Sequence, residues 1–514
     1  MPLRAGRLGL ATVPKLSTRK GISEVQLSHK PRSIVAKFDD ANLVSSAGLV
    51  PGMALAASAR LRELADERLS VPTDKGANAG LKVCSLVAGM VAGADSIDDM
   101  ALLRHGGMGR VFDRAYAPST LGSFLRSFTF GHVRQLDAVA SRFLTTLAER
   151  TPLVGPVGGG GFVLVDVDDT IIEVHGYAKQ GAGFGYSGVR GLNALLATVT
   201  TAGTAPVIVA QRLRKGSVGS PRGAKRLVVD ALKTVRGLRG LSGGRPLVRA
   251  DSAFYGRGLV LAAVGSGADV SVTVRLDKRV KAAIAAIADD AWTPIQYTDA
   301  IYDEATGEWI SRAEIAEAPF TAFASRRKAD QVPGRLVVRR IPDLNTDKNT
   351  DKNTDKNTDR NTDKNTEKNQ ASGQDTLFDV WRFHAFFTTV DPDVMDTVTV
   401  DKTHRGHAII EQVNADLKHS ALAHLPSGVF TANAAWLVLA VMAFNLTRAA
   451  ATLAGPELAK ARTATIRRKL INIAARIASS ARRITLHLPT GWPWEDAWTA
   501  LFNHVCGPPA TTTS

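Results

Sequence analysis

The sequence predicts an α/β protein built on a mixed sheet, flanked by helical regions. Strand-like runs alternate with helical stretches in the middle of the chain, the strands at 163–168, 195–200, 207–213, 247–250 and 270–276, the helices at 224–239 and 258–264. Consecutive strands followed by strand–helix units are typical of an α/β core with a mixed sheet. Helical periodicity precedes and follows this core, and 45% hydrophobic with 22% charged residues is the balance of a globular protein.

The first segment, residues 1–154, is predicted to be mainly helical. Apolar residues recur at three- and four-residue spacing from 51 to 150, as in Leu136, Val139, Phe143 and Leu147. A small DNA-binding module and a helical packing subdomain both fit this pattern. The sequence does not decide between them.

Three further segments complete the predicted organisation: 155–281 as the first part of the core, 282–400 as a β-rich insertion, and 401–514 as a helical part that completes the core. Within the insertion, the tetrapeptide Asn345-Thr346-Asp347-Lys348 is repeated through 369. The repeats contain no apolar residue to bury, so 345–369 is predicted to be a disordered surface loop. The apolar run 434–444 is shorter than the roughly 20 residues that span a bilayer, and we expect a buried helix and no membrane association.

The charge of the chain favours a polyanionic partner. Its 64 Lys and Arg against 48 Asp and Glu give a formal charge of +16, and nucleic acid is the commonest partner of so basic a protein. Between 211 and 250 the chain has eleven basic residues and one acidic residue. We predict that Arg212, Arg214 and Lys215, which leave a predicted strand, bind DNA phosphates.

Basic residues also punctuate the helical pattern between 451 and 490. This segment and the 51–150 region are the two alternatives for the part that recognises DNA. A solvated helix face with no DNA contact is the other interpretation of these charges. Cys84 and Cys506 are the only cysteines. Two distant cysteines make neither a disulfide framework nor a zinc site, so a reducing compartment is expected.

Three acidic residues form the candidate site. Asp168 lies in an apolar strand-like run, Asp251 ends another, and Glu411 lies in a helical pattern. Such carboxylates can converge on two Mg²⁺ or Mn²⁺ ions, an arrangement that suits in-line attack on a phosphodiester. On a strand, Asp166 shares a face with Asp168 while Asp169 points the other way. Two carboxylates on one face repel each other unless a cation binds, although an N-cap role is the structural alternative for Asp251.

The helix around Glu411 supports the same interpretation. Lys418 is seven residues beyond Glu411, so the two share one helix face. His407 lies one turn before Glu411 on this face, and Arg405 is nearby. A metal-binding carboxylate flanked by phosphate contacts would have this charge pattern, so Lys418, Arg405 and His407 are predicted to contact DNA. An exposed helix with paired charges is the alternative.

The run 163–170 also matches the first motif of haloacid-dehalogenase-type phosphatases. In that reading Asp166 would be the nucleophile and Asp168 the general acid and base. The context fits poorly, because about 160 residues precede a motif that usually opens its domain. We therefore rank the phosphatase below a DNA-cutting enzyme.

Seven short motifs then follow one another along the chain: Val165-Asp166-Val167-Asp168-Asp169-Thr170, His175-Gly176-Tyr177-Ala178-Lys179-Gln180, Tyr186-Ser187-Gly188, Arg249-Ala250-Asp251-Ser252, His407-Ala408-Ile409-Ile410-Glu411-Gln412-Val413, Leu422-Ala423-His424-Leu425-Pro426-Ser427-Gly428 and Asn433-Ala434-Ala435-Trp436. Each motif is weak alone, but the ordered set is specific. In this order the chain resembles bacterial insertion-sequence transposases of the DDE type, close to insertion-sequence family 1380. The resemblance covers nearly the whole chain except the tetrapeptide repeat.

The resemblance implies an RNase H-like catalytic core with a β-rich insertion between Asp251 and Glu411. It implies cut-and-paste transposition with two divalent ions held by Asp168, Asp251 and Glu411, with Asp166 as the alternative for the first position. The implied partners are double-stranded DNA, as terminal inverted repeats and as target, and a second copy of the chain in a synaptic dimer. The implied location is the bacterial cytoplasm at the nucleoid.

One departure from the relatives concerns the last carboxylate. Related transposases have a Tyr-x2-Arg-x3-Glu-x6-Lys signature, and Glu411 and Lys418 match it. His404 and His407 stand where the relatives have Tyr and Arg, which puts the phosphate contacts of those positions in doubt. A catalytically dead copy that binds DNA as a regulator is the other function class that the sequence leaves open.

Overall fold

The computed structural model describes residues 35–507 apart from several gaps, namely 73, 113, 156, 158–160, 202, 296–301, 304–307, 310–312, 343–380 and 481–482. The chain divides into two compact units, Met1–Asp40 and Ala41–Ser514. The second unit contains every helix and strand described below. The predicted repeat loop at 345–369 lies outside the described residues.

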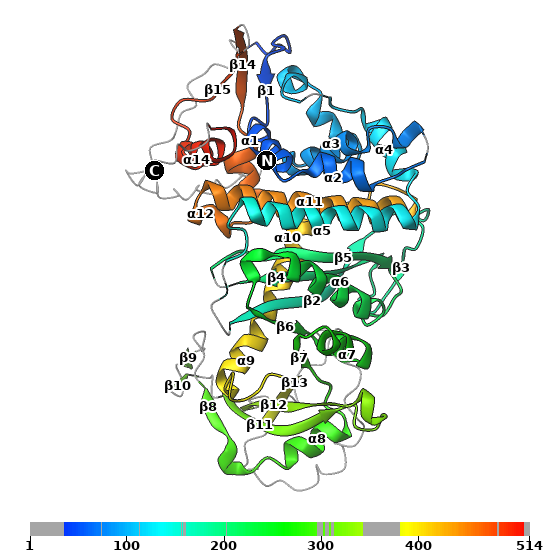
Figure 1. The fold of residues 1–514 in the computed structure, drawn as a ribbon, viewed down its shortest axis with the longest axis vertical. Coiled ribbons are helices and arrows are strands. Elements are labelled where there is room, and N and C mark those ends of the chain that lie inside the picture. Colours follow the sequence, from blue (N-terminus) through cyan, green and yellow to red (C-terminus); the bar gives the residue numbers. More distant parts are fainter. Residues whose placement is uncertain are drawn as a thin grey trace, which may run out of the picture. The chain divides into compact units, whose positions relative to one another are not determined.

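Helices make up the segment before the sheet. They are α1 (Leu49–Ser58), α2 (Leu61–Arg68), α3 (Ala79–Ala92), α4 (Pro118–Arg126) and α5 (Phe130–Arg150). The apolar residues whose spacing predicted a helix at α5 form its inward face. All four of them are buried, namely Leu136, Val139, Phe143 and Leu147. Helix α5 runs alongside the long helix α11 (Phe430–Ala454) (Figure 1).

The predicted mixed sheet is confirmed, and its strands lie close to the predicted runs. They are β2 (Phe162–Glu173), β4 (Arg190–Thr200), β5 (Val207–Lys215), β6 (Arg245–Ala250) and β7 (Asp269–Thr273), with the short β3 (Gly183–Phe184) beside β4. Strand β4 pairs antiparallel with both β2 and β5. Strand β6 pairs parallel with both β2 and β7. The order across this part of the sheet is therefore β5-β4-β2-β6-β7.

Helices cover both faces of the sheet. Helix α6 (Ala224–Gly237) lies on one face, and α10 (Ile409–Lys418) lies on the other (Figure 1). Helix α7 (Arg257–Gly265) packs against α6, and α9 (Thr397–Arg405) leads into α10 through a short 3-10 turn at Gly406–Ala408. Because side chains alternate along a strand, β2 presents Asp166 and Asp168 to α10 and turns Asp169 to the α6 side.

The insertion extends the main sheet. It contains α8 (Lys278–Ala285) and the strands β8 (Thr293–Ile295), β11 (Ala313–Ala322), β12 (Val332–Pro342) and β13 (Trp381–Thr388), with a small separate hairpin of β9 (Tyr302–Asp303) and β10 (Glu308–Trp309). Strand β13 pairs antiparallel with β7. Through this pairing the core and the insertion form one ten-stranded sheet.

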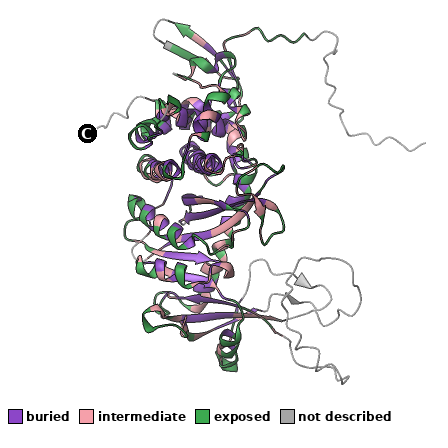
Figure 2. Ribbon diagram, turned by 90° about the vertical axis from the view of Figure 1, so that its right-hand side faces the viewer, coloured by how far each residue is buried: buried purple, intermediate pink, exposed green. Residues whose placement is uncertain are grey.

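Helix α11 forms the centre of the protein, and nearly all of its length is buried (Figure 2). Among the described residues it is the one helix long and apolar enough to cross a membrane, and 94% of its most apolar window is buried inside the protein. Its Asn445 amide bonds both the N–H and the C=O of Ile208, at 3.0 and 2.8 Å. These bonds satisfy main-chain groups at the outer edge of β5, which would otherwise be open to strand pairing.

The predicted helical pattern from 401 to 489 is wrong for its last part. After α12 (Pro456–Ala459), α13 (Thr463–Ile466) and a π-helical turn at Arg467–Ile471, the chain forms β14 (Ala475–Ser480) and β15 (Arg483–His487) before α14 (Glu495–Cys506). Strand β14 also pairs with β1 (Leu43–Val44). Burial of Ala475 and Ile477 around exposed Arg476 follows a period of two, which is the pattern of a strand.

Candidate active site

Asp168 lies in the middle of β2, and Asp251 directly follows the last residue of β6. Val167 on β2 is paired in parallel with Ala250 on β6, and each aspartate is the next residue of the chain. Neighbouring strands lie about 4.8 Å apart, so the register itself brings the two carboxylates together. The predicted strand 163–168 ended at Asp168, but β2 continues to Glu173, so the prediction of a strand-end position is correct for Asp251 and wrong for Asp168.

Both carboxyl groups of this pair hold protons more tightly than usual. Burial and, to a smaller extent, the negative charges of Asp251 and Asp169 raise the pKa of Asp168 to about 6. Loss of hydration likewise raises the pKa of Asp251. A backbone N–H and the nearby His407 partly offset each shift. Asp251 also accepts a hydrogen bond from the Ala253 N–H at 3.0 Å, which caps the next turn and holds its side chain in place.

Helix α10 turns one polar face toward β2. Asn414 donates from Nδ2 to Oδ2 of Asp168 at 2.8 Å, and it lies three residues after Glu411 and four before Lys418, on the same helix face. The side chain of Glu411 is exposed in the first turn of α10. The sequence interpretation missed Asn414, although its spacing from Glu411 was a usable signal.

The structure assembles the three predicted carboxylates only in part. Among the described residues, Glu411 has neither a hydrogen bond nor an ion pair to Asp168 or Asp251, and no group of three or more His, Cys, Asp or Glu side chains is arranged to hold a metal ion. Glu411 is one helical turn from the amide that touches Asp168. A turn rises about 5.4 Å, so Glu411 is carried one turn along α10 from the residue that bonds Asp168, and its side chain does not join the pair.

Asp166 belongs to a separate, buried ion pair. It is 0% exposed, and its two oxygens accept from Nε and Nη2 of Arg249 at 2.7 and 2.8 Å. Arg249 also donates to the carbonyls of Thr403 and Gly406 at the junction of α9 and α10. His407 adds a contact from Nδ1 to Asp166 at 3.2 Å. Asp166 and Arg249 therefore fasten the start of α10 to the sheet, a role that the sequence interpretation missed.

The residues that depart from the expected signature have structural partners. His404 is bonded to the hydroxyls of Ser271 and Thr273 and stacks on Phe386 at 4.0 Å. Burial lowers the pKa of His404 to about 3, so it stays neutral. Arg405 pairs with Asp401 at 2.9 Å. Any phosphate contact by Arg405 must compete with this pair.

The far end of α10 is also anchored inside the protein. Asp416 is buried and pairs with Arg448 of α11. It also accepts from the backbone N–H of Thr463 at 3.0 Å. Helix α10 is thus held by one buried ion pair near each end. The exposed Glu411 lies between these anchors, and the exposed Lys418 lies two residues beyond Asp416.

Two of the three arginine and lysine residues predicted on β5 are not free surface cations. Arg214 is buried, and it bonds Asp169 at 2.7 Å, Asn193, and the carbonyls of Ser220 and Arg222. This placement contradicts a phosphate contact by Arg214, because its donors are used inside the protein. Lys215 is exposed at the end of the strand, and its predicted role remains a proposal.

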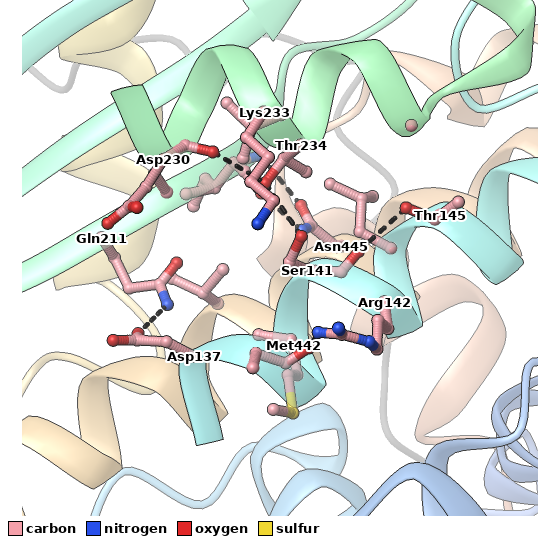
Figure 3. Close-up of a pocket in the computed structure, with 18 of the residues that line it drawn as sticks. Asp137, Ser141, Arg142, Thr145, Gln211, Asp230, Lys233, Thr234, Met442 and Asn445 are labelled. Atoms are coloured by element: carbon pink, nitrogen blue, oxygen red, sulfur yellow. Dashed lines mark hydrogen bonds between the residues drawn. The ribbon is translucent and has the colours of Figure 1, made fainter. Parts of the chain in front are cut away.

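Arg212 lies in a polar cluster that joins α5 and α6 to the sheet. It pairs with Asp137 of α5 at 2.9 Å and with Asp230 of α6. Gln211 donates to Asp137 at 2.6 Å on the wall of a cavity of about 380 Å³ (Figure 3). Arg212 is thus engaged between two aspartates, which argues against the predicted DNA contact.

Comparison with known proteins supports one family. The family model described as transposase DDE domain group 1 matches residues 26–338 and 370–506. The unmatched interval between these ranges contains the whole tetrapeptide repeat at 345–369. No curated protein matches the chain. Because the match takes in β2, β6 and α10 together with most of the remaining sequence, the chain belongs to the DDE transposase family.

Proposed function

We propose that the protein cuts DNA at the ends of an insertion sequence and joins those ends to target DNA, by metal-dependent cut-and-paste transposition. The observation that carries this proposal is the pair Asp168 and Asp251, two adjacent carboxyls with raised pKa values. Among the described residues neither has an arginine or lysine partner. A cation from outside the chain would relieve this repulsion.

The strand order supports an RNase H-like core. The five strands lie in the order β5-β4-β2-β6-β7, the first three antiparallel to their neighbours and the last two parallel to β2, and this mixed sheet is compatible with such a core. The carboxylates then occupy the middle strand, its parallel neighbour and a helix on one face. The insertion that extends the sheet lies between the second and third of them in sequence.

The donor set fits divalent ions such as Mg²⁺ or Mn²⁺, which prefer carboxylate oxygens. Asp168, Asp251 and Glu411 are the residues that would hold the ions. When bound, the ions supply an activated water and stabilise the leaving 3′ oxygen. Asp168 rather than Asp166 takes the first position in this proposal, because Asp166 is fully buried and both of its oxygens are bonded to Arg249.

The residues of the chain then have separate tasks. Asn414 orients the Asp168 carboxylate through its hydrogen bond. The buried pair of Asp166 and Arg249 holds the helix that carries Glu411. Exposed Lys418 and Lys215 are placed to bind phosphates. His407 lies close enough to influence both aspartates and would stabilise their charged forms.

The partners follow from this activity. We propose that the substrates are duplex DNA with the terminal inverted repeats and a target duplex, that two copies act together in a synaptic complex, and that this takes place at the bacterial nucleoid. Membership of insertion-sequence family 1380 is likewise part of the proposal. The phosphatase alternative is disfavoured, because its nucleophile would be the inaccessible Asp166.

Cleavage of a labelled duplex carrying the end of the element tests the proposal. We expect wild type to cut at the element boundary with Mg²⁺, and Glu411→Ala to lose that cutting. Glu457→Ala, at an exposed glutamate on α12, is the matched control and should cut normally. Binding without cutting by the wild type would identify an inactive, regulatory copy. Equal cutting by Glu411→Ala would remove Glu411 from the catalytic set.

A further inference from the structure

The connection between β2 and β4 exposes three aromatic side chains close to the candidate site. Tyr177 is 97% exposed, Phe184 is 65% exposed and Tyr186 is 102% exposed. Tyr186 and Ser187 form the tip of a tight turn in which the Gly188 N–H bonds the Gly185 carbonyl at 3.1 Å. The Tyr177 ring has a structural contact, because the Arg190 guanidinium lies over it at 5.7 Å. The exposed rings of Phe184 and Tyr186 indicate a binding role.

Two of these rings border a cavity of about 730 Å³. Phe184 and Tyr186 form one part of its wall, Thr170 and Ile171 of β2 form another, and Lys418 of α10 lies at its edge. Thr170 is two residues beyond Asp168 on the same strand. Lys418 is one helical turn beyond Asn414, the residue that bonds Asp168. The cavity is therefore the neighbour of the carboxylate pair.

The lining of the cavity suits a nucleotide. Its volume falls in the range of small-molecule pockets, about 300–1,000 Å³. Aromatic and aliphatic walls can hold a base, and the hydroxyls of Ser187, Ser217 and Ser220 can bond its edge. Lys418 offers a positive charge for a phosphate, while the nearby Asp169 is already neutralised by Arg214. Glu173 places a negative charge on another part of the wall, so it is the aromatic wall with one lysine beside it, and not the total charge, that favours a flat ring joined to a phosphate.

We propose that this cavity takes one unpaired nucleotide of the DNA strand that is cut at Asp168 and Asp251, with its base against Tyr186 and its phosphate near Lys418. The proposal rests on the proposed function. Both faces of a base inside a duplex are covered by its neighbours, so a ring at a pocket wall can stack on it only after it leaves the helix. The motif Tyr186-Ser187-Gly188 thereby acquires a role in holding the substrate.

A thermodynamic cycle between the ring and the base tests the proposal. Affinity for the element-end duplex is measured in Ca²⁺ with full-length wild type, Tyr186→Ala and Tyr186→Phe. The duplex is either intact or carries a single abasic site, moved one position at a time across the element boundary. Tyr177→Ala is the matched control, because Tyr177 is an equally exposed tyrosine of the same connection that does not line the cavity.

On intact DNA, we expect Tyr186→Ala to weaken binding by about 5-fold to 150-fold, the range for removing a ring that stacks on one base. Tyr186→Phe and Tyr177→Ala should bind like the wild type. At one abasic position beside the cut, wild type and Tyr186→Ala should bind equally, since no base remains to stack. A penalty for Tyr186→Ala that is the same at every abasic position, or no penalty at all, would overturn the proposal.

The proposed function has a separate readout. If the wild type cuts the element end in Mg²⁺ but the cycle shows no coupling, the nucleotide pocket is wrong and the transposase proposal stands. If the wild type binds but does not cut, the cleavage proposal fails, while the binding cycle still reports whether Tyr186 contacts a base.

Discussion

Strand β2 carries two kinds of aspartate within four residues. Asp166 and Asp169 each have an arginine from another strand of the sheet, Arg249 at 2.7 Å and Arg214 at 2.7 Å. Asp168, between them, has the neutral amide of Asn414, and Asp251 beside it has a backbone N–H. The sheet thus provides an arginine for two of the aspartates of β2. Asp168 and the neighbouring Asp251 have no such cation among the described residues.

The aspartates with an arginine partner and those without one have different roles in the protein. A buried ion pair satisfies both of its members, so it can hold elements in place but has no capacity left for a ligand. Carboxylates without a partner cost stability while they are charged and gain it when a cation arrives. In this protein the paired aspartates position the sheet and α10, and the unpaired ones are available to metal ions.

Breaking the buried pair should have the largest effect on stability. Arg249→Met leaves Asp166 without its arginine and also removes the bonds to the Thr403 and Gly406 carbonyls. We expect the free energy of unfolding, measured by urea titration, to fall by about 3–5 kcal/mol, because an uncompensated charge stays buried.

The same strand offers a matched control for this change. Arg245 of β6 forms a half-exposed pair with Asp269 at 2.8 Å, and Arg245→Met should cost no more than about 1 kcal/mol. If the two variants lose equal stability, Asp166 and Arg249 do not have the structural role assigned here.

Removing the unpaired negative charge of Asp168 should raise the free energy of unfolding instead of lowering it. The pKa of Asp168 is raised to about 6 in the folded protein, so its ionised form destabilises the fold above pH 6. We expect metal-free Asp168→Asn to be more stable than wild type by on the order of 2–3 kcal/mol at pH 8. The wild type regains this difference as the pH falls through 6, and below about pH 4 the two should be equal.

Added Mg²⁺ sharpens this test. Thermal unfolding at pH 8 should show that Mg²⁺ stabilises the wild type more than Asp168→Asn, because the variant has lost the negative charge that the ion would neutralise. A stability difference that does not change between pH 4 and pH 8 would show that the Asp168 carboxyl is not the origin of the effect.

Much of the fold could be predicted from sequence because local patterns determine it. Runs of alternating or continuous apolar residues located β2, β5 and β6, although β2 continues five residues beyond its predicted end at Asp168, and the parallel register of β2 and β6 sets Asp168 level with Asp251. Strand β14 was missed although its hairpin partner β15 follows it directly; only its second pairing, with β1 more than 400 residues away, lacks a local signal. No local pattern reports such a pairing.

The arginines show a second limit of sequence interpretation. A dense basic segment predicted that Arg212 and Arg214 contact DNA, but both are used in pairs with aspartates from other elements. Composition counts charges without saying which of them neutralise each other in the fold. For the same reason Asp166 could not be separated from Asp168 until Arg249 was seen to bond only the former.

The smallest expected effect tests how the fold supports the unpaired carboxylates. Asn414→Leu keeps the helix and its approximate volume but removes the donor to Asp168. Loss of such an orienting hydrogen bond typically reduces metal affinity or activity by about 10-fold to 100-fold. We expect the Mg²⁺ concentration needed for half-maximal cutting of the element end to rise by that factor, with stability changed much less than in Arg249→Met.

Gln412→Ala, at an exposed position of α10, is the control and should cut normally. If Asn414→Leu cuts at the wild-type Mg²⁺ concentration, the amide does not orient Asp168 for the metal, and the free carboxylate pair alone determines how tightly the ions bind.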